Sequence, residues 1–385
     1  MNSPQRGRTD GRRSGPRSTN TRLEETNRPE EGVGDECGVK GEGCIRLLSN
    51  NINSLSINSN LKLSKVKAII DDFNVDIFGC QEVNVCWKSC RFSERLYRRL
   101  RGWRETCTSS VAYNTTESSR KKVQRGGVAM ITVGSMTYRK IKTGFDQSKL
   151  GRWQWTRYRG AQDRVLRVVN VYRPCQQFSL GSTYSQQARG LLKEKDSREP
   201  RAAWFADLSK EIKGWQEEGD SLIIMGDWNE DVRSNLFQQW REDLQLIDCS
   251  LSVLDNPQQA PATHNKGTAP IDTILCTAGV EVKKAGYLSF GEGIGDHRPL
   301  FIDVQLTSVL GIKMPPIKKA KARRLKLEDP RVVKKYNLEL EKYLRKHKVK
   351  ERSEFLQKYL CYGGEAQLVE LEFEDLDRIR IKGMQ

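Results

Sequence analysis

Several apolar stretches of this sequence end in polar residues that could do acid–base or metal chemistry. The clearest case is residues 223–229, Ile-Ile-Met-Gly-Asp-Trp-Asn. Asp227 and Asn229 stand two residues apart after the apolar run, so on an extended chain both point the same way. A carboxylate here can position or deprotonate a water, and an amide can contact a phosphoryl group. Gly-Asp-x-Asn also occurs in ordinary turns, so this motif alone does not define a site.

A second group combines a carboxylate with a histidine. Asp272 lies in an apolar stretch, where a bare carboxylate would be costly to bury and therefore needs a partner. His297, preceded by Asp296, can be that partner. An Asp–His pair fixes the imidazole tautomer and lets the imidazolium stabilise negative charge developing on a phosphoryl group. The other histidines, His264 in a predicted substrate-side loop and His347 in the basic tail, have less support.

Two further groups follow predicted strands early in the chain. Asn51 and Asn53 alternate on the extended chain, so both amides can face one side and donate to a phosphate oxygen or hold a carboxylate. Glu82 follows the apolar stretch 75–80, and a carboxylate at the mouth of a buried strand suits Mg²⁺. Asn-rich turns and solvated strand-end glutamates are common, so neither group is specific by itself.

A last pair, Tyr172 and Arg173, follows the apolar stretch 165–172. The tyrosine hydroxyl can bind a phosphate oxygen, and the guanidinium can offer it two parallel donors. Strands often end in Tyr and Pro, so this pair is also weak in isolation. The joint occurrence of all these groups, each at the end of a predicted strand, is what indicates a single site.

The elements that must position these groups are predicted from the spacing of apolar residues. Short apolar or alternating runs predict strands at 45–49, 75–80, 127–133, 154–158, 165–172, 222–225, 271–276, 281–290 and 300–306. Helical spacing occurs over 61–73, and an apolar helical stripe, Trp204, Leu208, Ile212 and Trp215, lies between residues 172 and 222. Many short strands with a few helices between them predict two sheets packed face to face, with helices outside.

Charge divides the 385-residue chain into three parts. The net charge of +17 favours an anionic partner such as nucleic acid. Residues 1–44 are neutral overall and poor in aliphatic residues, which predicts disorder. Residues 45–310 carry +9 and residues 311–352 carry +11. We therefore predict a disordered segment over 1–44, one α/β domain over 45–306, and a basic linker with a charged, partly helical tail over 307–385.

Two basic regions are candidates for contact with such a partner. Lys121, Lys122 and Arg125 precede the stretch 127–133, and basic residues interleave with aromatic ones over 149–159. Basic and aromatic side chains together suit backbone contact and base stacking. For the second region the alternative is that alternating strand residues merely face solvent.

Composition argues against other classes of protein. The ten cysteines form no Cys-x-x-Cys pair and no Cys/His cluster at zinc spacing, and no apolar leader is present, so free thiols inside the cell are expected. Apolar runs such as 222–225 are too short to cross a bilayer, so no membrane partner is expected. The basic segment 318–324 fits a nuclear localisation signal, an arm that holds DNA or RNA, or a solvated linker; we predict a nuclear location.

Taken in chain order, these groups resemble the endonuclease/exonuclease/phosphatase superfamily over residues 45–306. The resemblance implies a four-layer α/β-sandwich, two packed mixed β-sheets flanked by helices, and a divalent-metal phosphodiesterase or phosphatase. Matched by motif, the predicted site consists of catalytic Tyr172, Asp227, Asn229, Asp272 and His297; metal ligands Asn51, Glu82 and Asp296; and substrate-binding Asn53, Lys121, Lys122, Arg125 and Arg173. The implied cofactor is Mg²⁺, with Mn²⁺ as the alternative.

Within that superfamily, residues 186–215 look most like the endonuclease domains of non-LTR (LINE-type) retrotransposons. Residues 329–333 look like the segment that joins such a domain to a reverse transcriptase. A Tyr-x-Asp-Asp polymerase motif is not found, so the chain would be the nuclease module alone or a truncated reading frame. Many relatives carry an aromatic residue at position 50 and an Asp at position 53. Asn53 lacks that carboxylate, which could weaken metal affinity.

The implied activity is in-line hydrolysis of a DNA phosphodiester. Asp227 would orient or deprotonate water and His297 would stabilise the transition state; which of the two is the base stays open. The expected partners are DNA and, through the basic tail, RNA or a reverse transcriptase. Two alternatives remain. One is a non-catalytic nucleic-acid-binding protein derived from such a nuclease, and the other is a phosphoinositide or sphingolipid phosphoesterase of the same fold.

Overall fold

A computed structural model describes residues 31–104, 106–117, 122–312, 330–361 and 366–384. The chain divides into two compact units, residues 1–314 and residues 315–385. The first unit holds every predicted site residue, and the second is a group of helices. Each unit is described separately below.

The first unit contains two mixed sheets. In spatial order, the first sheet consists of β1 (Val33–Gly34), β12 (Val282–Tyr287), β13 (Leu300–Gln305), β2 (Cys44–Asn51), β3 (Ile77–Gln81), β5 (Val128–Val133) and β4 (Cys107–Ala112). The second sheet consists of β10 (Leu246–Asp248), β11 (Asp272–Thr277), β9 (Ser221–Asp227), β8 (Val165–Tyr172), β7 (Trp153–Arg159) and β6 (Lys140–Phe145). In each sheet one neighbouring pair is parallel, β2 with β3 and β8 with β9, and the other pairs are antiparallel.

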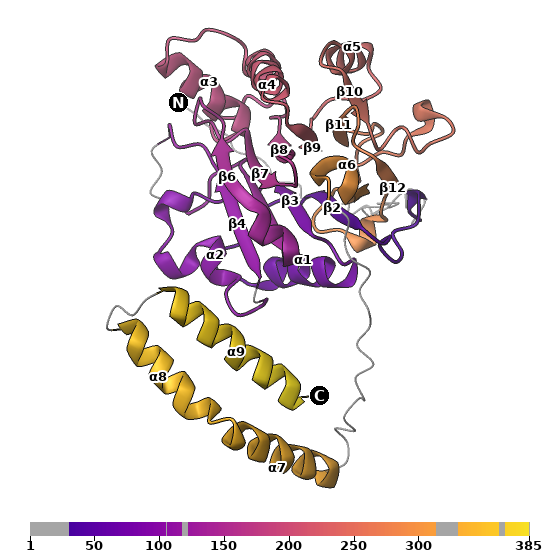
Figure 1. The fold of residues 1–385 in the computed structure, drawn as a ribbon. Coiled ribbons are helices and arrows are strands. Elements are labelled where there is room, and N and C mark those ends of the chain that lie inside the picture. The colour runs from indigo at the N-terminus through magenta and orange to yellow at the C-terminus, as the bar shows by residue number, and fades with distance from the viewer. Residues whose placement is uncertain (1–30, 105, 118–121, 313–329, 362–365, 385) are drawn as a thin grey trace, which may run out of the picture. The chain divides into compact units, whose positions relative to one another are not determined.

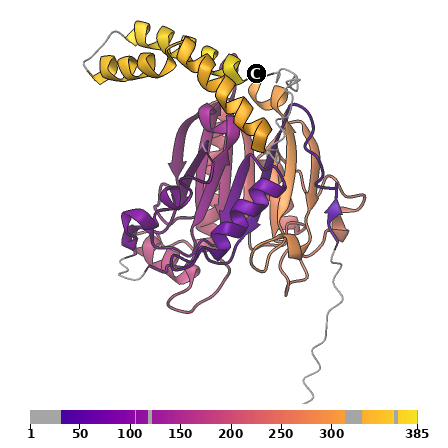
Figure 2. The ribbon, with the colours of Figure 1, turned by 90° about the horizontal axis from the view of Figure 1, so that it is seen from below.

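Helices cover the outer faces of both sheets (Figures 1 and 2). The longer helices of this unit are α1 (Leu61–Asp72), α3 (Thr183–Lys193), α4 (Pro200–Glu217) and α5 (Asn235–Asp243), and the short ones are α2 (Leu96–Arg99) and α6 (Leu306–Leu310). The apolar face of α1 packs on β2, β3 and β5, and the Trp204–Trp215 stripe of α4 packs on the second sheet. The predicted α/β-sandwich of two packed mixed sheets flanked by helices is confirmed.

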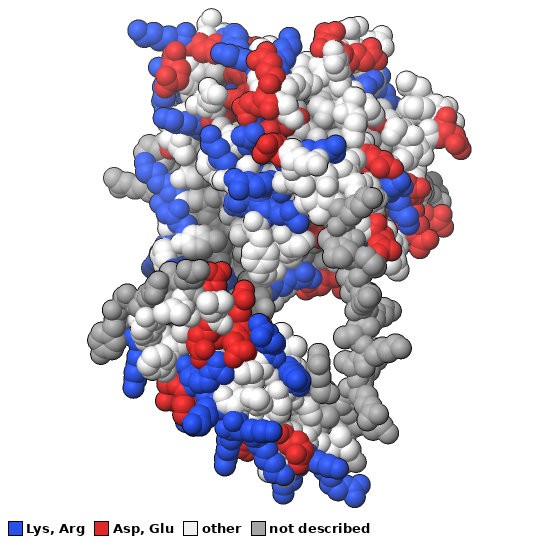
Figure 3. Space-filling view, in the orientation of Figure 1, with Lys and Arg blue, Asp and Glu red and all other residues white. Residues whose placement is uncertain are grey.

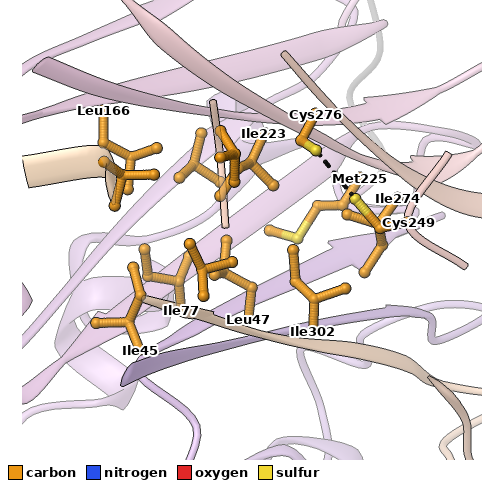
Figure 4. Packing of buried hydrophobic residues seen from close by; sticks show 14 of the residues in the cluster. Ile45, Leu47, Ile77, Leu166, Ile223, Met225, Cys249, Ile274, Cys276 and Ile302 are labelled. Atoms are coloured by element: carbon orange, nitrogen blue, oxygen red, sulfur yellow. Dashed lines mark hydrogen bonds between the residues drawn. The ribbon is translucent and has the colours of Figure 1, made fainter. Parts of the chain in front are cut away.

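The packing of α1 and of α4 on the sheets forms two hydrophobic cores. A third core lies between the sheets, where aliphatic side chains of both sheets meet (Figure 4). Ile45, Leu47 and Ile77 of the first sheet face Ile223 and Met225 of the second. At one end of this core the thiols of two neighbouring strand segments lie 3.3 Å apart, those of Cys249 and Cys276. Both are free cysteines in the structure.

The structure differs from the sequence predictions at the edges of the sheets. Residues 31–44, predicted as disordered, are ordered in the structure, and β1 pairs with β12 through Val33 and Tyr287. This segment is held by backbone bonds that need no aliphatic side chains, which is why composition missed it. The edge strands β4 and β6 were also missed, because their sequences, Cys-Thr-Ser-Ser-Val-Ala and Lys-Ile-Lys-Thr-Gly-Phe, have little apolar character. Residues 1–30 lie outside the described part of the chain.

The second unit contains three helices, α7 (Pro330–Lys346), α8 (Val349–Cys361) and α9 (Ala366–Met384). The sequence predicts a charged, partly helical tail over 307–385, and these helices lie within it. The acidic residues Glu372 and Asp375 of α9 pair with Arg352 of α8. None of the described helices is long and apolar enough to cross a bilayer.

Candidate active site

The register of the second sheet places three of the predicted residues side by side. Tyr172, the last residue of β8, is opposite Asp227 of β9, and Asp227 is opposite Asp272, the first residue of β11. Paired residues on neighbouring strands project to the same face. All three side chains are buried, so the strand ends present a row of two carboxylates and one phenol. The row faces the first sheet.

The first sheet supplies the opposite wall. Asn51 ends β2, and Glu82 follows β3 at the parallel position one residue further on. Glu82, Asn53 and Asn229 all have left-handed backbones, with φ of 48°, 42° and 46°. Such conformations cost about 1 kcal/mol or more for a residue other than glycine, and they concentrate at functional sites. The three strained residues border this one region.

Asp272 and His297 form the predicted pair. The carboxylate of Asp272 lies 2.8 Å from Nδ1 of His297, and both side chains are buried. Burial alone would disfavour the charged imidazole. The carboxylates of Asp272, Asp227 and Asp296 outweigh burial and raise the pKa of His297 to about 10. The histidine is therefore an imidazolium at neutral pH, with Nε2 facing the rest of the site.

Asp227 is held by two amides. Nδ2 of Asn51 donates to it at 2.9 Å, and Asn229 donates to it from its backbone at 2.9 Å and from its side chain at 3.2 Å. Burial, and then the charge of Asp272, raise the pKa of Asp227 to about 8. With a pKa of about 8 the group holds its proton through much of the neutral range, and the carboxylate form, which can take a proton from water, predominates above about pH 8. Nδ2 of Asn51 also lies 3.4 Å from Nε2 of His297, so Asp227 and His297 border the same space.

Glu82 and Tyr172 join the two walls. The hydroxyl of Tyr172 donates to one carboxylate oxygen of Glu82. Burial and the charge of Glu82 raise the pKa of Tyr172 well above its ordinary value, so the phenol stays protonated. The same two residues line a cavity of about 230 Å³ that also contains Asn53 and Arg125. The cavity is the open side of the site.

Asp296 stands at the rim with a residue that the sequence interpretation undervalued. The side chain of Asn53 donates to Asp296 at 3.1 Å, and Nε2 of His264 lies 3.5 Å from the same carboxylate. The rings of His264 and His297 meet edge to face with centroids 4.9 Å apart, and their backbones form an isolated bridge. His264 therefore belongs to the site. Sequence spacing gave no sign of this, because the bridge joins two loops 33 residues apart.

The side chains present fit a hard divalent cation. Four carboxylates gather here, those of Glu82, Asp227, Asp272 and Asp296, against one buried imidazolium. Within the described ranges Glu82 has no Lys or Arg ion-pair partner, and Tyr172 occupies only one of its oxygens. Carboxylate and amide oxygens are the ligands that Mg²⁺ prefers. The ligand atoms of two trios lie within 4.8 Å of one another, those of Asp227, Asp272 and His297 and those of His264, Asp296 and His297, while Glu82 borders the same region through Tyr172.

The predicted substrate-binding residues fare unequally. The side chain of Arg173 is buried, where it pairs with Glu230 at 2.8 Å and packs on the ring of Phe205 at 4.3 Å, and its contact with substrate stays a prediction. Lys122 is tied to Glu94 at 2.6 Å. Arg125 is exposed and lines the cavity beside Glu82. Lys121 lies outside the described residues.

The interleaved basic and aromatic stretch 149–159 is structural rather than a binding surface. Arg152 is buried and paired with Asp146 at 2.8 Å, and Arg157 is paired with Asp220 at 2.7 Å. Trp153 and Tyr158 are buried in the cores. Along β7, Trp153, Trp155 and Arg157 share one face, where the rings pack with α4 and Arg157 pairs with Asp220, and Tyr158 lies on the other face in the core between the sheets.

Buried amides below the site hold the two walls at a fixed separation. Nδ2 of Asn170 donates to the backbone oxygens of Cys80 and Ala129 in the first sheet, at 3.0 and 2.8 Å. Nε2 of Gln81 donates to the side-chain oxygen of Asn170 at 2.5 Å. Nδ2 of Asn50 donates to the backbone oxygen of His297 at 3.1 Å. Residue type in the sequence does not reveal this bracing.

Comparison with known proteins supports the fold. No protein-family model and no curated protein matches the chain. Among solved structures, an AP endonuclease from Leishmania major matches with a TM-score of 0.50 and 12% identity, covering 68% of this chain and 88% of that one. The catalytic domain of APE2 from Xenopus laevis matches with a TM-score of 0.49 and 17% identity, covering 68% of this chain and 92% of that one. At these identities the likeness concerns the α/β-sandwich fold alone.

Proposed function

We propose that this chain is a divalent-metal-dependent endonuclease that hydrolyses DNA phosphodiester bonds. The observation that carries the proposal is the convergence of the Asp272–His297 pair, Asp227 with its two amides, and Glu82 on one space between the sheets. These are the parts that in-line hydrolysis needs: a base for water, a stabiliser for developing negative charge, and oxygen ligands for a cation.

Each residue has a distinct role in this mechanism. Asp227, with its raised pKa and fixed by Asn51 and Asn229, accepts a proton from the attacking water. His297 keeps its proton because of Asp272, so it donates through Nε2 to the phosphoryl oxygens as their charge grows. The raised pKa of His297 therefore favours Asp227 as the base. A bound Mg²⁺ or Mn²⁺, held by Glu82 and Asn51 with Asp296, would neutralise a phosphate oxygen and the leaving group.

Nucleic acid is favoured over a lipid phosphoester by charge and by the likeness of the fold. The chain carries a net charge of +17, and the structure with a TM-score of 0.50 is described as an AP endonuclease. The sequence resemblance over residues 186–215 extends the proposal to the target-nicking module of a LINE-type retrotransposon, acting in the nucleus. A reverse transcriptase or RNA partner through the basic tail rests on that resemblance alone.

A plasmid-nicking assay with the full chain tests the proposal. With Mg²⁺ the chain should convert supercoiled DNA to the open circle, and excess EDTA should stop it. Asp227→Asn and His297→Gln should each lower the rate by at least about 100-fold, because each removes a group that acts on the transferred phosphoryl. The matched controls are Asp163→Asn in an exposed turn and His347→Gln in the second unit, which should keep full activity.

Three outcomes would contradict the proposal. Nicking that survives EDTA or both site variants would place the activity elsewhere. Binding of DNA without cutting under any divalent cation would identify a non-catalytic binding protein. Hydrolysis of phosphoinositide or sphingolipid micelles without nicking would identify a lipid phosphoesterase of the same fold.

A further inference from the structure

A second cavity, of about 750 Å³, lies at one edge of the first sheet. The residues that line it come from α2, the segment after it, β4 and the start of β6, and they include Arg98, Arg101, Trp103, Arg104, Cys107 and Lys140. Its position is remote from the candidate active site. Cys107 pairs with Val133, the last residue of β5. Glu82 lies at the opposite end of that strand, where the backbone of the next residue, Val83, donates to Gly127 just before β5 begins.

The cavity is basic on all sides. Four of its lining side chains are cationic, and no Asp or Glu is among the described residues that line it. Arg104 is neutralised by Asp71. Arg98, Arg101 and Lys140 have no ion-pair partner within the part of the chain that the structure describes. Burial lowers the pKa of Lys140, and no carboxylate offsets it. Figure 3 shows Lys and Arg side chains gathered on the face where Figure 1 draws β6.

Polar atoms in the cavity wall also lack partners. Nε of Arg98 and the hydroxyl of Thr108 are buried and make no hydrogen bond in the structure. Because these two atoms have almost no accessible surface, the cations that a ligand in the cavity can reach include the exposed Arg101 and the half-buried Lys140. The guanidinium of Arg98 is already fixed over the ring of Phe92, 4.0 Å from its centroid. The donors are thus held in place before any ligand arrives.

We propose that this cavity binds the backbone phosphates of a single-stranded nucleic acid, at a site separate from the candidate active site. Guanidinium and ammonium groups, with hydroxyl donors between them, are suited to phosphate oxygens. Tyr97 and Trp103 beside them offer ring surfaces for an unpaired base. The phosphates of a duplex also lie on its exterior, so the choice of an unpaired strand rests on these two rings, on which only an unpaired base can stack. The inference does not require that the chain cuts anything.

A thiol in the cavity wall provides a local test. Cys107 is half-buried, and burial raises its pKa to about 11. Cys37 is also half-buried, with a pKa of about 11 for the same reason, but it lies at the other end of the sheet, beside Arg46 and Asp303. Alkylation of both thiols in the full chain is followed by mass spectrometry in excess EDTA, with and without (dT)12 or (rU)12. We expect either oligonucleotide to slow alkylation of Cys107 at least fivefold and to leave Cys37 unchanged.

A second measurement uses charge. The triple variant Arg98→Gln, Arg101→Gln, Lys140→Gln should lower the slope of log affinity against log salt by about 2, since each lost phosphate contact removes about 0.7 for a single strand. The matched control changes three exposed lysines, Lys88, Lys195 and Lys213, to Gln and should change the slope by less than half as much. Protection confined to one oligonucleotide identifies the preferred sugar and supports the site.

Two results would overturn the inference. One is alkylation of Cys107 that neither oligonucleotide slows. The other is a salt slope that falls equally in the cavity variant and the control, which would mean that only general charge is involved. Neither result depends on hydrolysis, so failure of this inference and failure of the proposed endonuclease activity are distinguishable.

Discussion

At the scale of single residues, the charge of one histidine defines the chemistry of the site. His297 is buried among carboxylates, and its contact with Asp272 at 2.8 Å lets it keep a proton that burial alone would remove. An imidazolium cannot accept a proton from water. In the proposed mechanism the base is therefore Asp227, in the carboxylate form that predominates above its pKa of about 8.

This assignment predicts that Asp272→Asn lowers the pKa of His297 by at least about 2 units from its value of about 10. Without the negative charge of Asp272 the imidazolium is less stable, and the lowering of the pKa by burial is no longer offset by this carboxylate. The measurement is an NMR titration of the imidazole signals in EDTA, which is simple because the chain has only three histidines. Asp163→Asn is the control, and an unchanged pKa in Asp272→Asn would contradict the assignment.

For Arg173 we predict an effect on the free energy of unfolding. Its guanidinium is buried against Phe205 and paired with Glu230. Arg173→Ala should lower the free energy of unfolding by about 3 kcal/mol, because it breaks a buried ion pair and empties its packing site. Urea denaturation measures the effect. Arg189→Ala, which breaks the more exposed pair with Glu117, should cost less than about 1 kcal/mol. Equal losses would contradict the argument.

The sequence predicts which single residues belong to the site only where a polar residue stands beside an apolar strand and has no other evident role. Asp227 ends an apolar strand and His297 lies shortly before another, and a polar group at such a place needs either solvent or a role. Arg173 follows a strand in the same way, yet its partners Glu230 and Phe205 come from distant segments that spacing cannot connect to it. His264 was undervalued for the same reason, since its contact with His297 exists only in three dimensions.

At the scale of elements, strand register does the positioning. Tyr172, Asp227 and Asp272 share a row because β8, β9 and β11 are aligned to within one residue. Gly226 permits this alignment: a Cβ there would lie 2.0 Å from the backbone oxygen of Val171 on the neighbouring strand. The glycine of the Gly-Asp-x-Asn motif is thus required by close backbone approach.

Gly226→Ala should therefore destabilise the fold by at least about 3 kcal/mol, since a backbone atom cannot move aside cheaply. Gly214→Ala is a matched substitution in the helix α4, where nothing lies within 4 Å of the added carbon. It should stabilise the protein by about 0.5–1 kcal/mol through helix propensity. Urea denaturation of both variants checks the sign of each effect. Two variants of equal stability would contradict the packing argument.

Central strands could be predicted from the sequence and edge strands could not. β2, β3, β8, β9 and β11 are buried on both faces, so they are near-continuous apolar runs. β4 and β6 are half-exposed edges rich in polar residues, which resemble loops. The order of strands also depends on long-range pairing, so the sequence predicted the class of fold but not which strand ends would be neighbours.

At the scale of the whole molecule, the candidate site lies entirely in the first unit, and the second unit with the preceding segment carries much of the charge. Residues 313–385 contain 20 Lys/Arg and 12 Asp/Glu. A chain truncated after residue 312 should keep nicking within about threefold. It should also bind DNA with a shallower salt dependence, because fewer counterions are released.

A nicking assay and a salt titration of binding test this prediction. The matched control is the full-length chain with the Lys and Arg of residues 318–324 changed to Gln, which removes charge without removing the helices. A truncated chain that folds, as judged by circular dichroism, but has lost nicking more than tenfold would show that the helical unit takes part in catalysis.

The candidate site draws its side chains from positions 51 to 297, nearly the full length of the first unit. Asn51 leaves the ribosome almost 250 residues before its partner His297 does. A growing chain therefore cannot assemble the candidate site until the segment between β12 and β13, which contains His297, has been synthesised. The candidate site stays incomplete until residue 297, which is about three quarters of the way along the chain.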